Sequence, residues 1–271
     1  MVTLFGGLPP VPSSNLAQRV KTQTSLSDLA SGKRVDSAAD DPAVLALSVD
    51  MDADLSSARQ ASRNTFSALA VARTAEGGMD GINQALAKLK ELSIQAGSST
   101  LSADGLAGVQ AEFDKTLETI DTLAATTEFN GTQLLDGSAG TLTFQVGTGG
   151  GAADQATLET QDFSTVALGL AGTAVGSVAE AGLASNAVDL ALADVAEAQA
   201  AVGATTNQLE ASAVNLQETI VNTSSSLSQR VDTDVGASSA DLASSLVMQQ
   251  AGIAMQVQAN ATQFSVLQLL G

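Results

Sequence analysis

Three aspartates alternate with other residues in Asp50-x-Asp52-x-Asp54, which is the spacing that opens a calcium-binding loop. Such a loop also needs a glycine at its sixth position and a glutamate at its twelfth. Those positions hold Leu55 and Ala61, inside a segment whose apolar residues follow a helical spacing. The three carboxylates are therefore expected on a solvated helix face and not around a metal ion.

Catalytic designs fare no better, because the chain has no histidine and no cysteine. Those two residue types supply most nucleophile–base pairs and most zinc ligands. The lysines fall on polar faces, without the desolvation that a catalytic lysine needs. The Gly147–Gly151 run is not followed by Lys-Ser or Lys-Thr, so it does not match a phosphate-binding loop. We expect no enzymatic function, no cofactor and no metal.

Composition favours thin layers of helices. Aromatic residues make up 3% of the 271 residues, and the apolar fraction comes largely from Ala, Leu and Val. Small aliphatic side chains pack helices closely but fill a wide core poorly. The net charge of −18 repels phosphate backbones, which argues against nucleic-acid binding. The sequence contains no run of ~18 apolar residues, so it predicts no membrane-spanning helix.

The charge is also unevenly spread, since residues 116–271 hold one basic residue, Arg230, against sixteen acidic ones. This imbalance predicts that basic side chains of the first half lie near carboxylates of the second half. The alternative is that both are solvated without fixed partners, because exposed ion pairs contribute only about 0–1 kcal/mol. The basic residues concerned are Arg59, Arg63, Arg73, Lys88 and Lys90.

Helix signals place the elements of the first half. Prolines at positions 9, 10 and 12 exclude a helix over residues 1–12, and Ser13 or Ser14 caps a helix that runs to about Ala30. Gly32 ends it. Asp40 or Asp41 caps the next helix, with Pro42 at its first position.

That second helix continues to about Ala96, and a third follows residues 97–100. Asn130-Gly131 and the alternation over residues 141–146 predict a small β-hairpin region. Helical spacing resumes near Leu183 and lasts to about Val235, Gly236 breaks it, and a last helix begins near Ser239. The predicted fold is mainly α, an elongated antiparallel helical rod or coiled coil with a small β-hairpin region.

The last helix is the most informative element, because Asp241 is the one charged side chain in residues 236–271. Its other polar positions include six glutamines and one asparagine, whereas a free surface helix normally carries charge on its outer face. We expect it to be buried against neighbouring subunits. A membrane-surface helix is the alternative, but the basic residues that such a helix needs are missing. The predicted assembly-interface residues are Leu16, Val20, Leu242, Leu246, Ile253, Val257, Phe264 and Leu267.

Several segments, in order along the chain, resemble bacterial flagellin. They are residues 31–41 (SGKRVDSAADD), 61–64 (ASRN), 74–77 (TAEG), 89–95 (LKELSIQ), 128–131 (EFNG), 249–252 (QQAG), 259–260 (AN) and 267–270 (LQLL). The alternatives are a hook–filament junction protein of the same family and a soluble coiled-coil binding module.

The resemblance implies a D0/D1-like arrangement in two concentric layers of a helical filament. Residues 1–40 and 236–271 would form the inner assembly domain. The rod domain would consist of helices and a β-hairpin region over residues 41–182 and the returning long helix over residues 183–235. The variable outer domains of larger flagellins would fall between residues 170 and 183, so the chain resembles a minimal, core-only member.

The resemblance further implies a homopolymer that serves motility, in an extracellular flagellar filament. Subunits would leave by type III export, secreted without a cleaved signal peptide. The implied partners are an export chaperone, a cap protein and a hook–filament junction protein.

An innate immune receptor reads one stretch in some flagellins, and the matching residues could instead make an axial subunit contact. Where the family has arginine this stretch has lysine, which lacks the forked donors of a guanidinium. The residues are Lys88, Leu89, Lys90, Glu91, Leu92 and Glu112.

Overall fold

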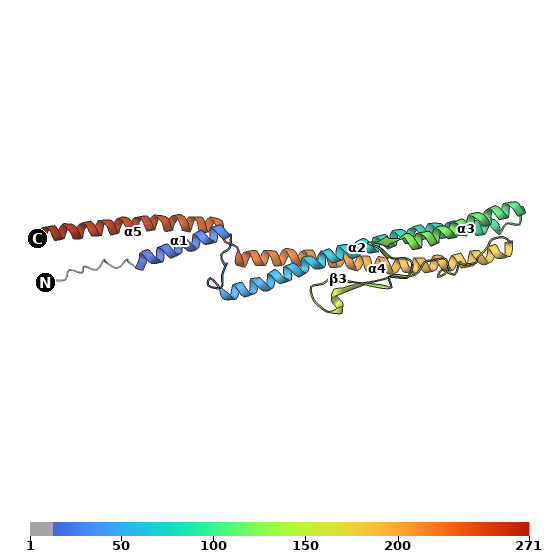
Figure 1. The fold of residues 1–271 in the computed structure, drawn as a ribbon, viewed down its shortest axis with the longest axis horizontal. Helices are drawn as coiled ribbons and strands as arrows, with labels where there is room; N and C mark the ends of the chain where they lie inside the picture. Colours follow the sequence, from blue (N-terminus) through green and yellow to red (C-terminus); the bar gives the residue numbers. More distant parts are fainter. Residues whose placement is uncertain (1–12, 271) are drawn as a thin grey trace. The chain divides into compact units, whose positions relative to one another are not determined.

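The computed structural model describes residues 13–270, with the side chains of all of these except residues 13–15, 263 and 266–270. The predicted absence of helix in residues 1–12 lies outside this range. The described residues fold mainly into α-helices with two small antiparallel sheets (Figure 1), which confirms the predicted fold class. The elements are α1 (Ser13–Ser31), α2 (Pro42–Ala96), α3 (Ala103–Thr126), β1 (Glu128–Phe129), β2 (Thr132–Gln133), β3 (Thr141–Gln145), the 3₁₀ turn η1 (Ala152–Asp154), β4 (Gln155–Glu159), α4 (Val178–Val231) and α5 (Val235–Leu270).

Two compact units share these elements. The central unit is Leu55–Val221, and the terminal unit combines the chain up to Asp54 with the chain from Asn222 onward. Helices α2 and α4 contribute residues to both units.

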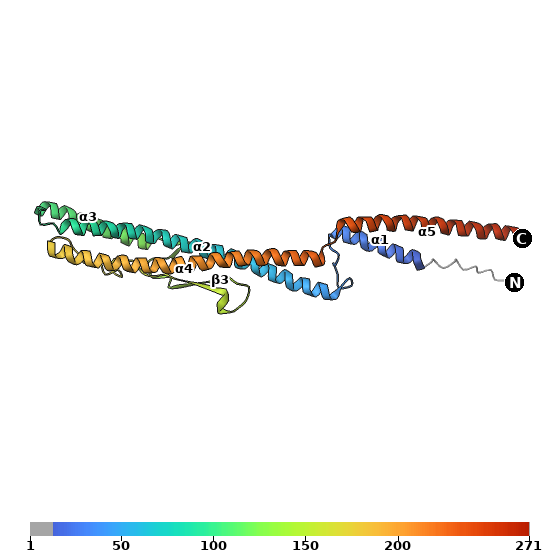
Figure 2. The ribbon, with the colours of Figure 1, turned by 180° about the vertical axis from the view of Figure 1, so that it is seen from behind.

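In the central unit, α2, α3 and α4 lie side by side (Figures 1 and 2). Helices α2 and α4 run antiparallel: Arg73 pairs with Glu210 at 3.0 Å, and Lys90, further along α2, pairs with Asp189, further back on α4. The interior is aliphatic with few aromatic rings, as the composition predicts. Its largest fully buried side chains are Met79, Ile82, Leu86, Leu89, Leu92, Phe113, Ile120, Leu134, Leu135, Leu158, Leu170 and Leu209.

The β-region consists of a tight hairpin and a two-stranded ribbon. Asn130 and Gly131 link β1 to β2 with φ angles of 51° and 79°, the positive values that a type I′ turn requires. In the ribbon, β3 pairs with β4 from Thr141↔Glu159 to Gln145↔Gln155. The Asn-Gly hairpin and the alternating strand are thus confirmed.

The hairpin region approaches α2 closely at Gly78. A Cβ atom at this position would lie 2.6 Å from both Leu135 Cδ1 and Thr127 Oγ1. At the neighbouring Gly77, a Cβ atom would meet nothing within 4 Å. Only the second of the two adjacent glycines is therefore needed for packing.

The end of α1 and the start of α2 follow the predicted signals, whereas Ser13 and Ser14 lie inside α1 and do not precede it. Gly32 has a φ of 71° directly after α1. The Asp41 carboxylate accepts the N–H groups of Ala43 and Val44, each at 3.0 Å, with Pro42 at the first helical position. Asp41, and not Asp40, is therefore the cap of α2.

Three predicted boundaries in the second half were wrong. Helix α4 begins at Val178 rather than near Leu183, because the Ser177 hydroxyl accepts the Glu180 N–H at 3.2 Å and caps an earlier start. Helix α5 begins at Val235, because Asp234 accepts the Ala237 N–H at 3.0 Å. Helix α4 already ends at Val231 and not near Val235, so Gly236 lies inside the first turn of α5 and does not end the preceding helix.

Candidate assembly interface

Helices α1 and α5 form an antiparallel pair within the terminal unit (Figure 1). Lys21 pairs with Asp241 at 3.8 Å, and the Thr233 N–H donates to Gly32 O at 3.0 Å. The sole charged side chain of the last 36 residues thus faces a cation of α1.

The segment between α1 and α2 is tied to the end of α4 in the same unit. The Arg34 N–H donates to Val231 O at 2.7 Å, and its guanidinium donates to Arg230 O at 2.6 Å. Val35, next to them, is buried. These hydrogen bonds hold in place the turn formed by residues 31–41, the first segment that resembles flagellin.

Asp40 organises the middle of this turn. Its carboxylate accepts the Ser37 hydroxyl at 2.9 Å, the Ser37 N–H at 2.9 Å and the Asp36 N–H at 3.3 Å. These hydrogen bonds, the Ser37 hydroxyl foremost, lower the pKa of the Asp40 carboxyl below its usual value of 3.8. The turn therefore prefers the ionised carboxylate.

We call the shielded face between α1 and α5 the seam. Its residues follow one another mainly at steps of three and four, which is the spacing of a coiled-coil contact. Most are small or polar, however, where a coiled coil would place leucine or isoleucine. The seam residues are Gln18, Thr22, Ser25 and Leu29 on α1 and Ser238, Leu242, Ser245, Gln249, Gly252 and Gln256 on α5.

Ser245 is the most deeply buried residue of the seam. Its side chain is 0% exposed, and its hydroxyl has no hydrogen-bond partner among the side chains and backbone that the structure describes. Leaving a buried hydroxyl unpaired costs about 1–3 kcal/mol. A seam of small and polar residues buries less apolar surface than the leucine and isoleucine residues of a coiled coil would.

Outside the seam, the large apolar side chains that the structure describes on this helix pair are exposed to solvent. From residue 239 to residue 262, every α5 residue other than the seam residues is exposed. Many exposed large apolar side chains on one helix pair mark an interaction site in a soluble protein. The large exposed apolar residues of α1, and of α5 beyond its first turn, form what we call the outward surface: Leu16, Val20 and Leu26 on α1 and Leu246, Val247, Met248, Ile253, Met255, Val257 and Phe264 on α5.

Six of the eight residues predicted for assembly lie on the outward surface. Phe264 is the most exposed of them, at 72%. Leu242 does not belong there, because it is half-buried in the seam. The side chain of Leu267 lies outside the described residues. The six are Leu16, Val20, Leu246, Ile253, Val257 and Phe264.

The polar seam was missed at the sequence level, although a signal for it exists. Ser238, Ser245 and Gly252 recur every seven residues, and so do Leu242, Gln249 and Gln256. A search for apolar residues alone passes over such a repeat, because its members are small or polar.

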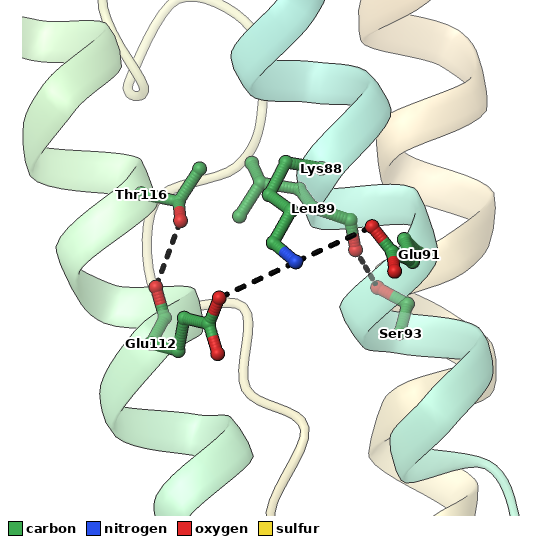
Figure 3. Close-up of polar contacts among 6 residues, drawn as sticks. All are labelled: Lys88, Leu89, Glu91, Ser93, Glu112 and Thr116. Atoms are coloured by element: carbon green, nitrogen blue, oxygen red, sulfur yellow. Dashed lines mark hydrogen bonds and ion pairs between the residues drawn. The ribbon is translucent and has the colours of Figure 1, made fainter.

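The proposed receptor or axial stretch divides into buried and exposed members (Figure 3). Leu89 and Leu92 lie in the core of the central unit. Lys88 lies between Glu91 and Glu112, at 3.3 Å from each, and so links α2 to α3. Hydrogen bonds to these carboxylates, to Glu91 first, raise the pKa of Lys88 above 10.5.

The predicted pairing of first-half cations with second-half carboxylates holds for two residues of five. Arg73 pairs with Glu210, and Lys90 donates to Asp189 at 2.5 Å and to the Ser185 hydroxyl at 2.8 Å. Lys88 instead uses carboxylates of the first half. Within the part of the chain that the structure describes, no carboxylate lies within 4.0 Å of Arg59 or Arg63.

Two other kinds of site are absent from residues 13–270. No group of three or more Asp or Glu side chains is placed to hold a metal ion among the described residues. In the same range, none of the helices combines the length and the apolar character that crossing a membrane requires.

Comparison with known proteins places this arrangement among flagellar proteins. Residues 13–140 match the bacterial flagellin N-terminal helical region, and residues 185–270 match the bacterial flagellin C-terminal helical region. Flagellin of Halalkalibacterium halodurans is 33% identical over 248 residues, covering 92% of this chain and 91% of that protein. Flagellin of Bacillus subtilis is 30% identical over 284 residues, covering 92% of each. The crystal structure of Bacillus cereus flagellin superimposes with a TM-score of 0.52 at 26% identity, over 57% of this chain and 88% of that one.

Proposed function

This chain belongs to the bacterial flagellin family as a short, core-only structural subunit of the flagellar filament, and we propose that its outward surface is where copies pack together. The observation that carries the proposal is the inverted polarity of the α1–α5 pair. The seam inside the pair is largely polar, whereas the side exposed to water is apolar. A helix pair that functioned alone would have the opposite arrangement.

Burial of the outward surface supplies a driving force for assembly. Complete burial of one Leu, Ile, Val, Met or Phe side chain contributes about 1.5–3 kcal/mol. Ten such side chains lie on this surface in each subunit. The charged residues on both helices are few, so little charge has to be desolvated when copies pack there.

The same balance couples folding of the terminal helices to association. In a lone subunit, the weak seam does not offset the conformational entropy of ordering α1 and α5. Neighbouring copies add the missing apolar contacts, so ordering and assembly occur together. On this proposal, residues 1–40 and 236–271 form the inner assembly domain of the filament.

Before assembly the outward surface requires a cover. An export chaperone that holds α5 would meet this need, and a cap protein and a hook–filament junction protein would bound the polymer at its ends. The proposed location is the extracellular filament, and the proposed role is structural and not catalytic. What supports these points is family membership together with the large apolar surface.

We assign half-buried Lys88 and the exposed residues Glu91 and Glu112 to a contact along the filament axis rather than to receptor binding. They already link α2 to α3 through Lys88, so a neighbour would meet a preformed surface. Leu89 and Leu92 serve the core of the central unit.

Seeded polymerisation tests the assembly proposal. Ile253→Asp and Phe264→Asp place a carboxylate in a surface that becomes buried, where an unpaired charge costs several kcal/mol. Both variants should stay in the supernatant at concentrations at which the wild-type chain sediments as filaments. Ile253→Leu, which keeps the apolar character, should polymerise normally. Filaments of normal yield from both aspartate variants would exclude the outward surface as the interface.

A further inference from the structure

Resting on the proposed polymerisation, we propose that a stripe on α2, formed by Arg59, Arg63 and Phe66, is a further contact surface, which packs against the acidic central unit of another copy of this chain. These three residues follow at steps of four and three, so they lie on one helix face. All three are exposed, and Phe66 is 59% exposed. The stripe belongs to the central unit and is therefore separate from the outward surface of α1 and α5.

Among the described residues, neither arginine of the stripe has a carboxylate within 4.0 Å. Arg63 donates to the side chain of Gln60, at 2.5 Å and 3.2 Å, and Arg59 makes no ion pair among the described residues. This is unexpected in a chain with 29 acidic residues and 11 basic ones. Other exposed cations of the central unit do have partners: Arg73 has Glu210, and Lys115 has Glu118.

Phe66 adds an apolar side chain next to the two arginines of the stripe. It is one of seven phenylalanines in a chain without tryptophan or tyrosine, and it faces solvent while Phe113 and Phe163 are buried. Arginine and aromatic side chains are the residue types enriched where protein–protein contacts are strongest. An exposed Arg-Phe stripe in an aromatic-poor chain therefore has the composition of a contact surface.

Charge complementarity identifies the occupant as a second copy. The central unit holds six basic and nineteen acidic residues, a net charge of −13. Copies in a polymer would repel one another unless a basic patch of one meets acidic side chains of the next. The outer side of α4 offers such side chains at Asp194 and Glu197, with Asp162 beside them.

A pair of charge-matched variants tests this inference. Arg63→Glu and Lys115→Glu change the net charge equally, but only Arg63 lies on the stripe. Both residues are exposed, so the thermal unfolding of the central unit should stay unchanged. Arg63→Glu should raise the concentration needed for seeded polymerisation roughly tenfold, whereas Lys115→Glu should stay within about twofold. Phe66→Ala should raise it as well, with less dependence on salt.

Equal effects of Arg63→Glu and Lys115→Glu would show a net-charge effect only and would overturn the inference. Normal polymerisation of Arg63→Glu and Phe66→Ala would overturn it too. So would a different acidic protein that binds wild-type filaments but does not bind normally formed filaments of Arg63→Glu. Polymerisation of the aspartate variants of Ile253 and Phe264, measured in parallel, separates the two proposals. If they fail to polymerise while the stripe variants succeed, only the stripe assignment is lost.

Discussion

At the scale of single residues, Asp40 has a role that its position alone does not reveal. It precedes the capping residue Asp41, yet its carboxylate points back to the Ser37 hydroxyl and to two backbone N–H groups. A carboxylate with this many donors stabilises the turn only while it is ionised. The turn at the start of α2 is therefore sensitive to acid.

The pH dependence of this turn has a definite sign. Because the folded pKa of Asp40 is lower than 3.8, its contribution is complete above pH 3.8 and is lost as the pH falls through the lowered value. Asp40→Asn should remove this dependence and weaken the turn at neutral pH. Nuclear magnetic resonance of the Ser37 N–H during an acid titration measures the effect. A midpoint at or above 3.8 in the wild-type chain would contradict it.

At the scale of elements, the two adjacent glycines of α2 differ in what they permit. Gly77→Ala should stabilise the central unit by about 0.5–1 kcal/mol, because alanine loses less backbone freedom in a helix and meets nothing there. Gly78→Ala should destabilise it by about 1–3 kcal/mol, since the new methyl group would overlap Thr127 and Leu135. Thr127 cannot easily turn away, because its hydroxyl donates to Leu123 O at 2.7 Å.

Denaturant unfolding of the two alanine variants checks this contrast. Similar changes in the free energy of unfolding for both variants would mean that the 127–135 segment does not press against α2.

Local signals made most elements predictable from the sequence. Asp41-Pro42 and Asn130-Gly131 act through short-range geometry, so their positions appear in the sequence directly. The start of α4 was missed because its first turns are rich in alanine and glycine and show no apolar period. Leu242 was predicted to lie in the assembly interface because α5 is apolar on most sides, and the spacing of its apolar residues does not distinguish the seam from the exposed surface.

Pairing of charges was the least predictable feature. Arg73 and Lys90 find carboxylates on α4, but Arg63, on the same helix, does not. The difference depends on which side of α2 faces α4, and composition carries no information about that rotation. Sequence therefore predicted which residues carry charge and not which residues meet.

At the scale of the whole molecule, the residues that hold the central unit together are separate from those proposed for assembly. All members of its main core cluster lie between Val71 and Val202. Deleting residues 240–271 should therefore abolish polymerisation while the central unit keeps its cooperative thermal transition. Circular dichroism together with sedimentation after seeding measures both properties. Loss of the helical signal from the central unit on deletion would contradict this separation.

The outward surface also has a chemical consequence, because two of its members carry a thioether sulfur. Met248 is 51% exposed and Met255 is 71% exposed. Peroxide would convert these side chains to sulfoxides, which are polar and chiral, and a sulfoxide is poorly suited to a dry contact between copies. Subunits treated with peroxide before assembly should polymerise poorly, and filaments treated afterwards should be protected at both positions. Peptide mass spectrometry of the two samples would show the difference, which makes oxidative damage a hazard of the unassembled chain.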